Sequence, residues 1–397
     1  MLEGKRIVLG VCGSVASYKG ADVASRLTQA GALVDVILTS SAQRFVSPLT
    51  FRALTQRPVC TDMFEPQSAV AEEHVELARA ADAVLVAPAS ATTIARLAHG
   101  LADDMLALTV LATVAPVLIA PAMDAQMWEH PATRANAATL RGRGVVIVGP
   151  DVGRLASGRS GAGRLVETAV LLGALSQALG ARGDFAGRRV VVSAGGTQEP
   201  LDPVRYLGNR SSGKMGFAIA EAARDRGAQV TLVSGPVALD APYGVERVDV
   251  RTTAEMAAAI GRATAGCDAL IMAAAPADFR PERTADQKIK RTAQGLTLEL
   301  VPNEDILAGL GGGCIKVGFA AETQDMRENA RAKVARKGLD LIVANDVRAA
   351  GAGFGTETNL VTLIDAAGNC EELPLLSKYD VGHRILDRVA ALLAARG

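Results

Sequence analysis

Short runs of valine, isoleucine, leucine and alanine alternate with longer amphipathic segments in the first half of the chain. These runs predict strands at Ile7–Val11, Val34–Thr39, Ala83–Ala87, Val117–Ala120 and Val145–Val148. Helical periodicity fills the gaps between them, for example at Ala21–Ala30 and Thr92–Ala98. Such an alternation of strands and helices predicts a parallel sheet with helices on both faces.

A polar, glycine-containing stretch at Gly180–Gly187 interrupts this pattern, and a second series of apolar runs follows it. The second series predicts strands at Arg188–Ser193, Gln229–Val233, Ala269–Ala273, Lys316–Phe319 and Leu341–Ala344. A hairpin formed by Asn359–Ile364 and Glu371–Leu376 follows, and a terminal helix is predicted at Lys378–Ala395. We therefore predict two doubly wound, Rossmann-like α/β domains, residues 1–180 and 188–397, joined near 181–187.

The uncharged stretch Leu106–Met123 is nearly long enough to span a bilayer. Pro116 and Pro121 interrupt it, which favours a helix end followed by a buried parallel strand. The apolar run at the start of the chain is too short for a signal peptide. We therefore expect a soluble, cytoplasmic protein that makes no membrane contact.

The length and composition of the chain argue against several classes of protein and of binding site. The length of 397 residues fits two domains. The 42 basic and 42 acidic residues cancel, which argues against a nucleic-acid-binding protein. The five cysteines and four histidines show no metal-ligand spacing, so we expect neither a structural zinc site nor a disulfide framework.

A donor-rich loop lies between a predicted strand that ends at Ser193 and a predicted helix at 215–226. Its two glycines, Gly195 and Gly196, alone would fit a tight turn. The polar side chains that follow favour an anion site at the helix start, although the Walker spacing is missing. They are Arg205, Asn209, Arg210, Ser211, Ser212 and Lys214.

Three small polar clusters follow predicted strands of the first domain, at the sheet edge where open α/β sheets bind ligands. They are Gly13 with Ser14, Ser40 with Ser41, and Ser90 with Thr92 and Thr93. Each alone could be an ordinary helix cap, but together they favour a nucleotide. The chain lacks G-x-G-x-x-G after the first strand, which argues against an NAD-linked dehydrogenase.

The segment Ser193–Gly216 resembles the ligase half of the bifunctional phosphopantothenoylcysteine decarboxylase / phosphopantothenate–cysteine ligase flavoproteins of coenzyme A biosynthesis. Further motifs extend this resemblance over nearly the whole chain. It implies a flavodoxin-like FMN domain followed by a nucleotide-binding ligase domain. The ligase would join cysteine to 4′-phosphopantothenate through an acyl-cytidylate made from CTP. The FMN domain would then decarboxylate the product to 4′-phosphopantetheine, with the flavin taking up and returning two electrons.

The resemblance also implies roles for individual residues. In the first domain, the implied FMN-binding residues are Gly13, Ser14, Ser40, Ser90 and Thr92. His74 of the H-V-E-L motif would be a catalytic residue. Met123 and Asp124 would bind substrate. In the second domain, the residues implied to bind substrate are Ser211, Ser212, Gly213 and Lys214, and Asn209 would serve turnover of the acyl-cytidylate. The residues implied to contact CTP are Asp278, Lys288, Asn303, Asp305, Ile306, Phe319, Lys333 and Lys337. Mg²⁺ would accompany the triphosphate without a dedicated protein metal site.

Two residues depart from the family pattern. Asp124 stands where the family has an asparagine that contacts the substrate carboxylate, and two carboxylates about 4 Å apart repel by about 4 kcal/mol at an effective dielectric constant near 20. Asp124 would therefore be protonated, be neutralised by a nearby positive charge, or slow the reaction. Ser157 stands where the family has a catalytic cysteine, and a serine hydroxyl is a far weaker acid than a thiol.

These departures leave alternatives to a fully active bifunctional enzyme. One is an active ligase fused to a weakened decarboxylase domain, and another is a flavin-bound regulatory binding subunit. The resemblance also implies a homo-oligomer, with trimeric contacts in the FMN domain and dimeric contacts in the ligase domain.

Overall fold

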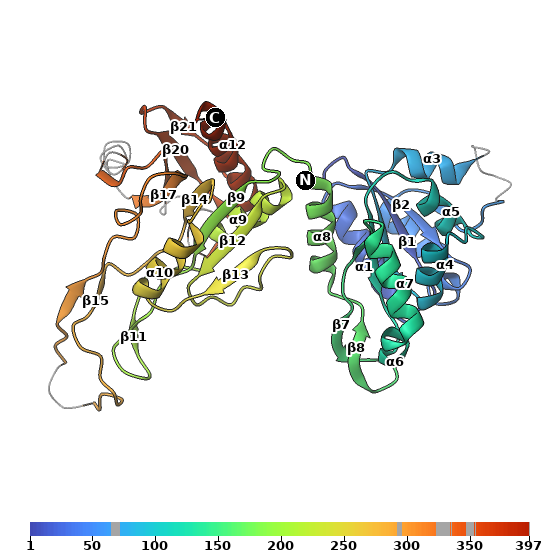
Figure 1. Cartoon of the computed structure of the whole chain (residues 1–397), viewed down its shortest axis with the longest axis horizontal. Coiled ribbons are helices and arrows are strands. Elements are labelled where there is room, and N and C mark those ends of the chain that lie inside the picture. Colours follow the sequence, from blue (N-terminus) through green and yellow to red (C-terminus); the bar gives the residue numbers. More distant parts are fainter. Residues whose placement is uncertain are drawn as a thin grey trace. The chain divides into compact units, whose positions relative to one another are not determined.

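The structure is a computed structural model that describes residues 1–64, 72–291, 296–322, 334, 336–346, 353 and 355–396. The chain divides into two compact units, Met1–Leu179 and Gly180–Gly397. Each unit contains its own mainly parallel sheet with helices packed against it (Figure 1). The expected α/β fold with two doubly wound sheets is confirmed.

The described part of the first unit forms a six-stranded parallel sheet in the order β3-β2-β1-β4-β5-β6. Its strands are β1 (Arg6–Val11), β2 (Leu33–Leu38), β3 (Val59–Cys60), β4 (Ala83–Ala89), β5 (Val117–Pro121) and β6 (Val146–Ile147). Strand β4 is buried along its whole length, as expected for a parallel strand covered on both faces. The strand order reverses between β1 and β4, so a crevice forms beyond their carboxyl ends.

The helices of this unit are α1 (Ser17–Gln29), α2 (Pro48–Thr55), α3 (Glu73–Ala80), α4 (Ala91–His99), α5 (Met105–Ala112), α6 (Ala125–Glu129), α7 (Pro131–Gly142) and α8 (Thr168–Gly180). Side-chain caps define where several of them begin. The Ser90 hydroxyl accepts the Thr93 amide at the start of α4, and the Asp104 carboxylate accepts the Ala107 amide at the start of α5. An antiparallel hairpin, β7 (Asp151–Arg154) and β8 (Ser160–Arg164), leads into α8.

The second unit has an eight-stranded sheet among its described residues, in the order β13-β12-β9-β14-β17-β18-β20-β21. Its parallel strands are β9 (Arg189–Ala194), β12 (Gln229–Ser234), β13 (Glu246–Asp249), β14 (Ala269–Met272), β17 (Ile315–Glu322) and β18 (Leu341–Asp346). Strands β20 (Val361–Asp365) and β21 (Cys370–Glu372) extend the sheet in antiparallel pairing. The six parallel strands therefore repeat the order found in the first unit.

Helices α9 (Lys214–Asp225), α10 (Thr253–Ala263) and α12 (Lys378–Arg396) cover this sheet. α9 packs closely on β9, because a Cβ atom at Gly216 would lie 2.6 Å from the Ser193 carbonyl oxygen. Four short strands form antiparallel pairs outside the main sheet, β10 (Glu199–Pro200) with β11 (Tyr206–Leu207) and β15 (Phe279–Pro281) with β16 (Leu300–Pro302). A further pair joins β19 (Thr358–Asn359) to β22 (Leu376–Ser377).

The stretch Leu106–Met123 contains most of α5 and the buried strand β5, as the sequence predicts. Among the described residues, no helix combines the length and the apolar composition needed to cross a bilayer.

Candidate active sites

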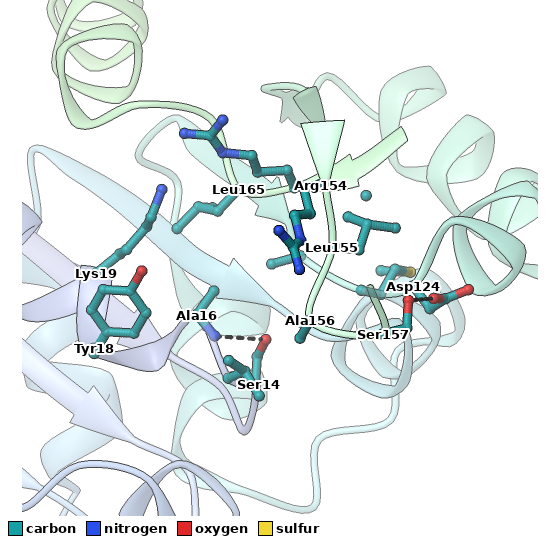
Figure 2. Close-up of a pocket in the computed structure, with 15 residues that line it drawn as sticks. Ser14, Ala16, Tyr18, Lys19, Asp124, Arg154, Leu155, Ala156, Ser157 and Leu165 are labelled. Carbon is teal, nitrogen blue, oxygen red and sulfur yellow. Dashed lines mark hydrogen bonds between the residues drawn. The ribbon is translucent and has the colours of Figure 1, made fainter. Parts of the chain in front are cut away.

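A cavity of about 520 Å³ lies in the first unit between the start of α1, the start of α6 and the β7–β8 hairpin (Figure 2). Its volume is in the usual range for pockets that bind small molecules and cofactors. The lining residues are Ser14, Val15, Ala16, Tyr18, Lys19, Ala122, Met123, Asp124, Arg154, Leu155, Ala156, Ser157, Gly163, Arg164 and Leu165.

Three polar loops lie side by side at this edge of the sheet. The loop after β1 touches the loop after β2, since a Cβ atom at Gly13 would lie 2.4 Å from the Ser41 Cβ. It also touches the segment after β4, where the Thr93 hydroxyl donates to the Cys12 Sγ over 3.2 Å. Ser14 caps its own turn by accepting the Ala16 amide. Hydroxyl groups and helix starts therefore converge here, as an anionic nucleotide requires.

The predicted residues of the first domain are only partly brought together. Ser14, Met123, Asp124 and Ser157 line the cavity. The other predicted FMN-binding residues lie on the three adjoining loops without lining it; they are Gly13, Ser40, Ser90 and Thr92. His74 is half-buried in the first turn of α3, and Figure 1 shows α3 at the end of the unit opposite the β7–β8 hairpin.

Positive charge dominates the rim of the cavity. Lys19, Arg154 and Arg164 all line it. Lys19 and Arg164 share Glu167 as a salt-bridge partner, with a separation of 3.7 Å for Lys19. Arg154 forms no ion pair within the described part of the chain, so its guanidinium group is available to an anionic ligand.

Asp124 and Ser157, the two departures from the family pattern, contact each other. The Ser157 hydroxyl donates to Oδ2 of Asp124 over 2.7 Å, while Oδ1 accepts the Gln126 amide over 3.0 Å and caps α6 (Figure 2). These hydrogen bonds, helped by the charge of Arg159, lower the pKa of Asp124. The structure therefore argues against a protonated Asp124 at neutral pH.

The cysteines of the first unit do not replace the missing flap thiol. Cys12 and Cys60 are both buried. Burial raises the pKa of Cys12 to about 11, although Thr93 donates a hydrogen bond to its sulfur. Burial and the neighbouring Glu73 also raise the pKa of Cys60. Neither thiol is therefore suited to proton transfer near neutral pH.

A second cavity, of about 320 Å³, lies beyond the carboxyl end of β14 in the second unit and is also lined by Phe319 of β17. Six of the eight residues predicted to bind CTP line it: Asp278, Asn303, Asp305, Ile306, Phe319 and Lys337. Lys333 lies outside the described residues, and Lys288 does not line the cavity. The residues that the resemblance implied thus come from four separate segments of the chain and line one cavity.

Hydrogen bonds fix the polar side chains of this cavity. Lys337 Nζ lies 2.9 Å from an Asp305 carboxylate oxygen. Partial burial opposes ionisation of Asp305, but Lys337 and two backbone amides outweigh it and lower the pKa of Asp305. Asn303 donates to the Ala277 carbonyl over 2.8 Å and accepts from Arg280. The cavity therefore presents an ion pair and oriented amide groups.

The donor-rich loop ends at Gly213, whose φ of 76° starts α9 and favours glycine. Asn209 donates to the carbonyl oxygen of Pro276 over 2.9 Å, and Pro276 lines the cavity. The ammonium group of Lys214 contacts the Gly355 carbonyl at 2.9 Å and pairs with Glu357. The loop is thus attached to the cavity wall by Asn209, while the charge of Lys214 is partly neutralised.

A buried carboxylate explains the position of Lys288. Asp202 accepts the Arg205 side chain and the Ile289 amide, and the Arg205 guanidinium donates to the Ile289 carbonyl over 2.7 Å. The peptide of Ile289 is therefore held at both ends by one ion pair, which we call the Asp202–Arg205 clasp. It fixes the segment that carries Lys288 and Lys290 beside the donor-rich loop.

Sequence reasoning missed Thr253 and Glu199. Thr253 lines the second cavity, is buried, and donates through its hydroxyl to the buried carboxylate of Glu199 over 2.8 Å. The sequence does contain a capping-box pattern, Thr252 with Glu255, which could have predicted that a helix begins next to Thr253.

No cluster of three or more metal-ligating side chains occurs in the described parts of either unit.

Comparison with known proteins covers both units. Residues 1–179 match the family described as Flavoprotein, and residues 185–393 match the DNA/pantothenate metabolism flavoprotein C-terminal domain. The chain is 48% identical to the coenzyme A biosynthesis bifunctional protein CoaBC of Bacillus subtilis (strain 168), with 100% of this chain and 99% of the relative covered. It is 46% identical to the CoaBC protein of Vibrio cholerae, with 95% and 96% covered. Among solved structures, the C-terminal domain of a CoaBC protein is 37% identical, with 54% of this chain and 99% of that chain covered and a TM-score of 0.47.

Proposed function

Because the chain belongs to the family of bifunctional CoaBC proteins of coenzyme A biosynthesis, we propose that its two cavities carry the two reactions of that family. The chain is an enzyme with phosphopantothenate–cysteine ligase and phosphopantothenoylcysteine decarboxylase activities. The observation that carries this conclusion is the similarity to CoaBC relatives across both units and over nearly the whole length of each relative. We place the decarboxylase in the first unit and the ligase in the second.

The first unit is a flavoprotein domain, and we propose that FMN binds at the three polar loops beside its cavity. The loops that carry Gly13 and Ser41 lie against each other, and the hydroxyl-rich loops with the cationic rim suit a phosphate. Bound FMN would supply two-electron oxidation and reduction. The chain's own residues bind and orient the substrate there, through the side chains of the α6 start and the hairpin.

Gly13→Ala is expected to weaken FMN binding about tenfold, which corresponds to about 1.4 kcal/mol. The added Cβ would lie 2.4 Å from the Ser41 Cβ and would push the two loops apart. The measurement is a fluorescence titration of apoprotein with FMN. Gly142→Ala is the control, because a Cβ at Gly142 has no neighbour within 4 Å among the described residues. Equal affinities of wild type and Gly13→Ala would contradict the assignment.

In the second unit, we propose that CTP occupies the cavity around Asn303 and Lys337, accompanied by Mg²⁺ held mainly by phosphate oxygens and water. A carboxylate does not react with an amine at neutral pH unless it is activated. The carboxylate of 4′-phosphopantothenate would react with CTP to form an acyl-cytidylate and release pyrophosphate, which provides that activation. Attack by the cysteine amine would then give the amide product and release CMP.

Lys337→Ala is expected to raise the KM for CTP about tenfold. The change removes a cation from the cavity and leaves the Asp305 carboxylate unpaired, 2.9 Å from the vacated ammonium position, so an incoming triphosphate meets net negative charge. Ligase assays with varied CTP measure this effect. Lys337→Arg keeps the charge and should show a much smaller change. An unaltered KM in the alanine variant would remove Lys337 from the nucleotide site.

We also propose that the enzyme is a homo-oligomer. His74 lies apart from the cavity of its own chain, so a catalytic role for it requires the α3 of a second copy. In the second unit, apolar side chains are exposed around the β11 and β15 segments, including Val204, Tyr206 and Phe279. Such surfaces are typical of protein contacts.

A stepwise assay tests the proposed function. Purified protein receives 4′-phosphopantothenate, cysteine and CTP, and the products are identified by mass. CMP release that requires all three, with the phosphopantothenoylcysteine mass, supports the ligase. Conversion of that product to 4′-phosphopantetheine supports the decarboxylase. Failure of either conversion would remove the corresponding activity from its unit.

A further inference from the structure

The β7–β8 hairpin is attached to the start of α6 along its second strand. The Met123 amide donates to the Gly163 carbonyl over 3.0 Å, and a Cβ at Gly163 would lie 2.2 Å from the Met123 carbonyl oxygen. A Cβ at Gly161 would lie 2.7 Å from the Ala125 Cβ. Only glycine therefore allows β8 to lie this close to the segment 123–125.

The tip of the hairpin forms a compact turn. The Leu155 amide donates to the Arg159 carbonyl over 2.8 Å, and the Gly158 amide donates to the Leu155 carbonyl over 2.9 Å. Gly158 has a φ of 82°, which closes the turn. This turn directs Ser157 toward Asp124 (Figure 2).

We propose that Asp124 and Ser157 form a latch that holds the tip of the β7–β8 hairpin across the cavity, so that both act as positioning residues in the decarboxylase reaction. This inference rests on the proposed function of the first unit. Each oxygen of the Asp124 carboxylate has a partner, Ser157 for Oδ2 and the Gln126 amide for Oδ1. The carboxylate is therefore engaged by the protein itself instead of being left to face a substrate carboxylate.

The latch fixes the groups that precede the tip. Leu155 is buried and lines the cavity, and Arg154 at the end of β7 lines it as well. Arg154 has no ion-pair partner in the described residues, whereas Lys19 and Arg164 share Glu167. A latched hairpin thus holds a free guanidinium over the cavity, where it would bind the phosphate or carboxylate of the substrate.

The two departures from the family pattern therefore depend on each other. A hydrogen bond from a hydroxyl to an ionised carboxylate is stronger than one between neutral groups. Asp124 without the Ser157 hydroxyl would have no partner for Oδ2 among the described residues, and only Oδ1 would keep a hydrogen bond, from the Gln126 amide. Ser157 without the carboxylate would leave the hairpin tip without its side-chain anchor to α6.

Hydrogen exchange of the full-length, FMN-loaded protein tests the latch without requiring turnover. Ser157→Ala should speed exchange of the amides at 155–159 about fivefold, since it removes a hydrogen bond to a charged group at an exposed site. Ser157→Thr keeps the hydroxyl and should exchange like the wild type. Ser160→Ala is the matched control, because Ser160 lies on the same hairpin and its side chain has no hydrogen bond in the described structure.

A double-mutant cycle identifies the partner. Asp124→Ala and Ser157→Ala should each speed exchange at the tip, and the double variant should be no faster than Asp124→Ala alone. Loss of the α6 cap is common to both variants that lack Asp124, so it cancels in the comparison. Independent, multiplying effects in the double variant, or a Ser157→Ala profile identical to that of Ser160→Ala, would overturn the latch.

Kinetics separate this inference from the proposed function. Ser157→Ala and Arg154→Gln should each raise the KM for phosphopantothenoylcysteine about fivefold and change kcat less. A loss of kcat beyond a hundredfold in Ser157→Ala, with unchanged KM and unchanged exchange, would make Ser157 a catalytic residue and refute the latch. A wild-type protein that shows coupled exchange but no decarboxylation would retain the latch and refute the decarboxylase function.

Discussion

Replacing Asn209 by alanine is expected to lower the rate of ligation at least about a hundredfold while the protein stays folded. Asn209 donates to the Pro276 carbonyl over 2.9 Å, so its side chain already lies against the wall of the second cavity. By the resemblance, this amide serves turnover of the acyl-cytidylate, in which charge develops on the acyl oxygen. Loss of one donor to such charge removes several kcal/mol of transition-state stabilisation.

Single-turnover assays with CTP and 4′-phosphopantothenate measure this effect. Without cysteine, the variant should still form the acyl-cytidylate. After cysteine is added, the intermediate should persist instead of being consumed. Asn369→Ala is the control, because Asn369 is exposed in the β20–β21 turn and bonds only Asp365 among the described residues. Ligation by Asn209→Ala at the wild-type rate would exclude Asn209 from the mechanism.

Replacing Arg224 by alanine is expected to destabilise the second unit by about 3–5 kcal/mol, because it leaves a buried carboxylate without its cation. The Arg224 side chain is 1% exposed. Its Nε donates to Asp225 over 2.7 Å and its Nη1 donates to the Tyr243 carbonyl over 2.7 Å. Tyr379 of α12 donates to the same Asp225 carboxylate over 2.7 Å, so the network connects α9 to α12.

Urea unfolding followed by circular dichroism measures this loss. The single tryptophan of the chain, Trp128, lies in the first unit, so tryptophan fluorescence should remain at its wild-type midpoint. Arg384→Ala is the control, because Arg384 is 51% exposed and pairs with Glu371, a type of pair that contributes less than about 1 kcal/mol. A midpoint for Arg224→Ala equal to that of Arg384→Ala would show that the buried network contributes little.

The long apolar strands were predictable because burial on both faces leaves a continuous hydrophobic run. β1, β4, β9 and β14 all begin and end within two residues of their predicted limits. β13, with the sequence Glu246-Arg247-Val248-Asp249, was not predicted, since an edge strand has solvent-facing charges and pairs on one side. The β7–β8 hairpin was missed for a similar reason, because it is rich in glycine and arginine.

Much of the second cavity was predicted through the family resemblance, whose motifs place Asp278, Asn303, Asp305, Ile306, Phe319 and Lys337 at one nucleotide site. Thr253 was not, because its place depends on how α10 packs against Glu199, a contact across 54 residues. The bond between Ser157 and Asp124 could not be inferred either. It depends on the hairpin turning back over α6, and sequence spacing says nothing about that turn.

The Asp202–Arg205 clasp makes two stretches of chain move as one. A single carboxylate with no exposed surface orients the arginine of the donor-rich loop and also the backbone between two lysines more than eighty residues later. Substitution of Asp202 would therefore displace Arg205 in the donor-rich loop and, at the same time, the segment that carries Lys288 and Lys290. A mutagenesis screen would score this aspartate like a residue of the proposed nucleotide site, although its carboxylate bonds only to Arg205 and to backbone amides of the protein itself.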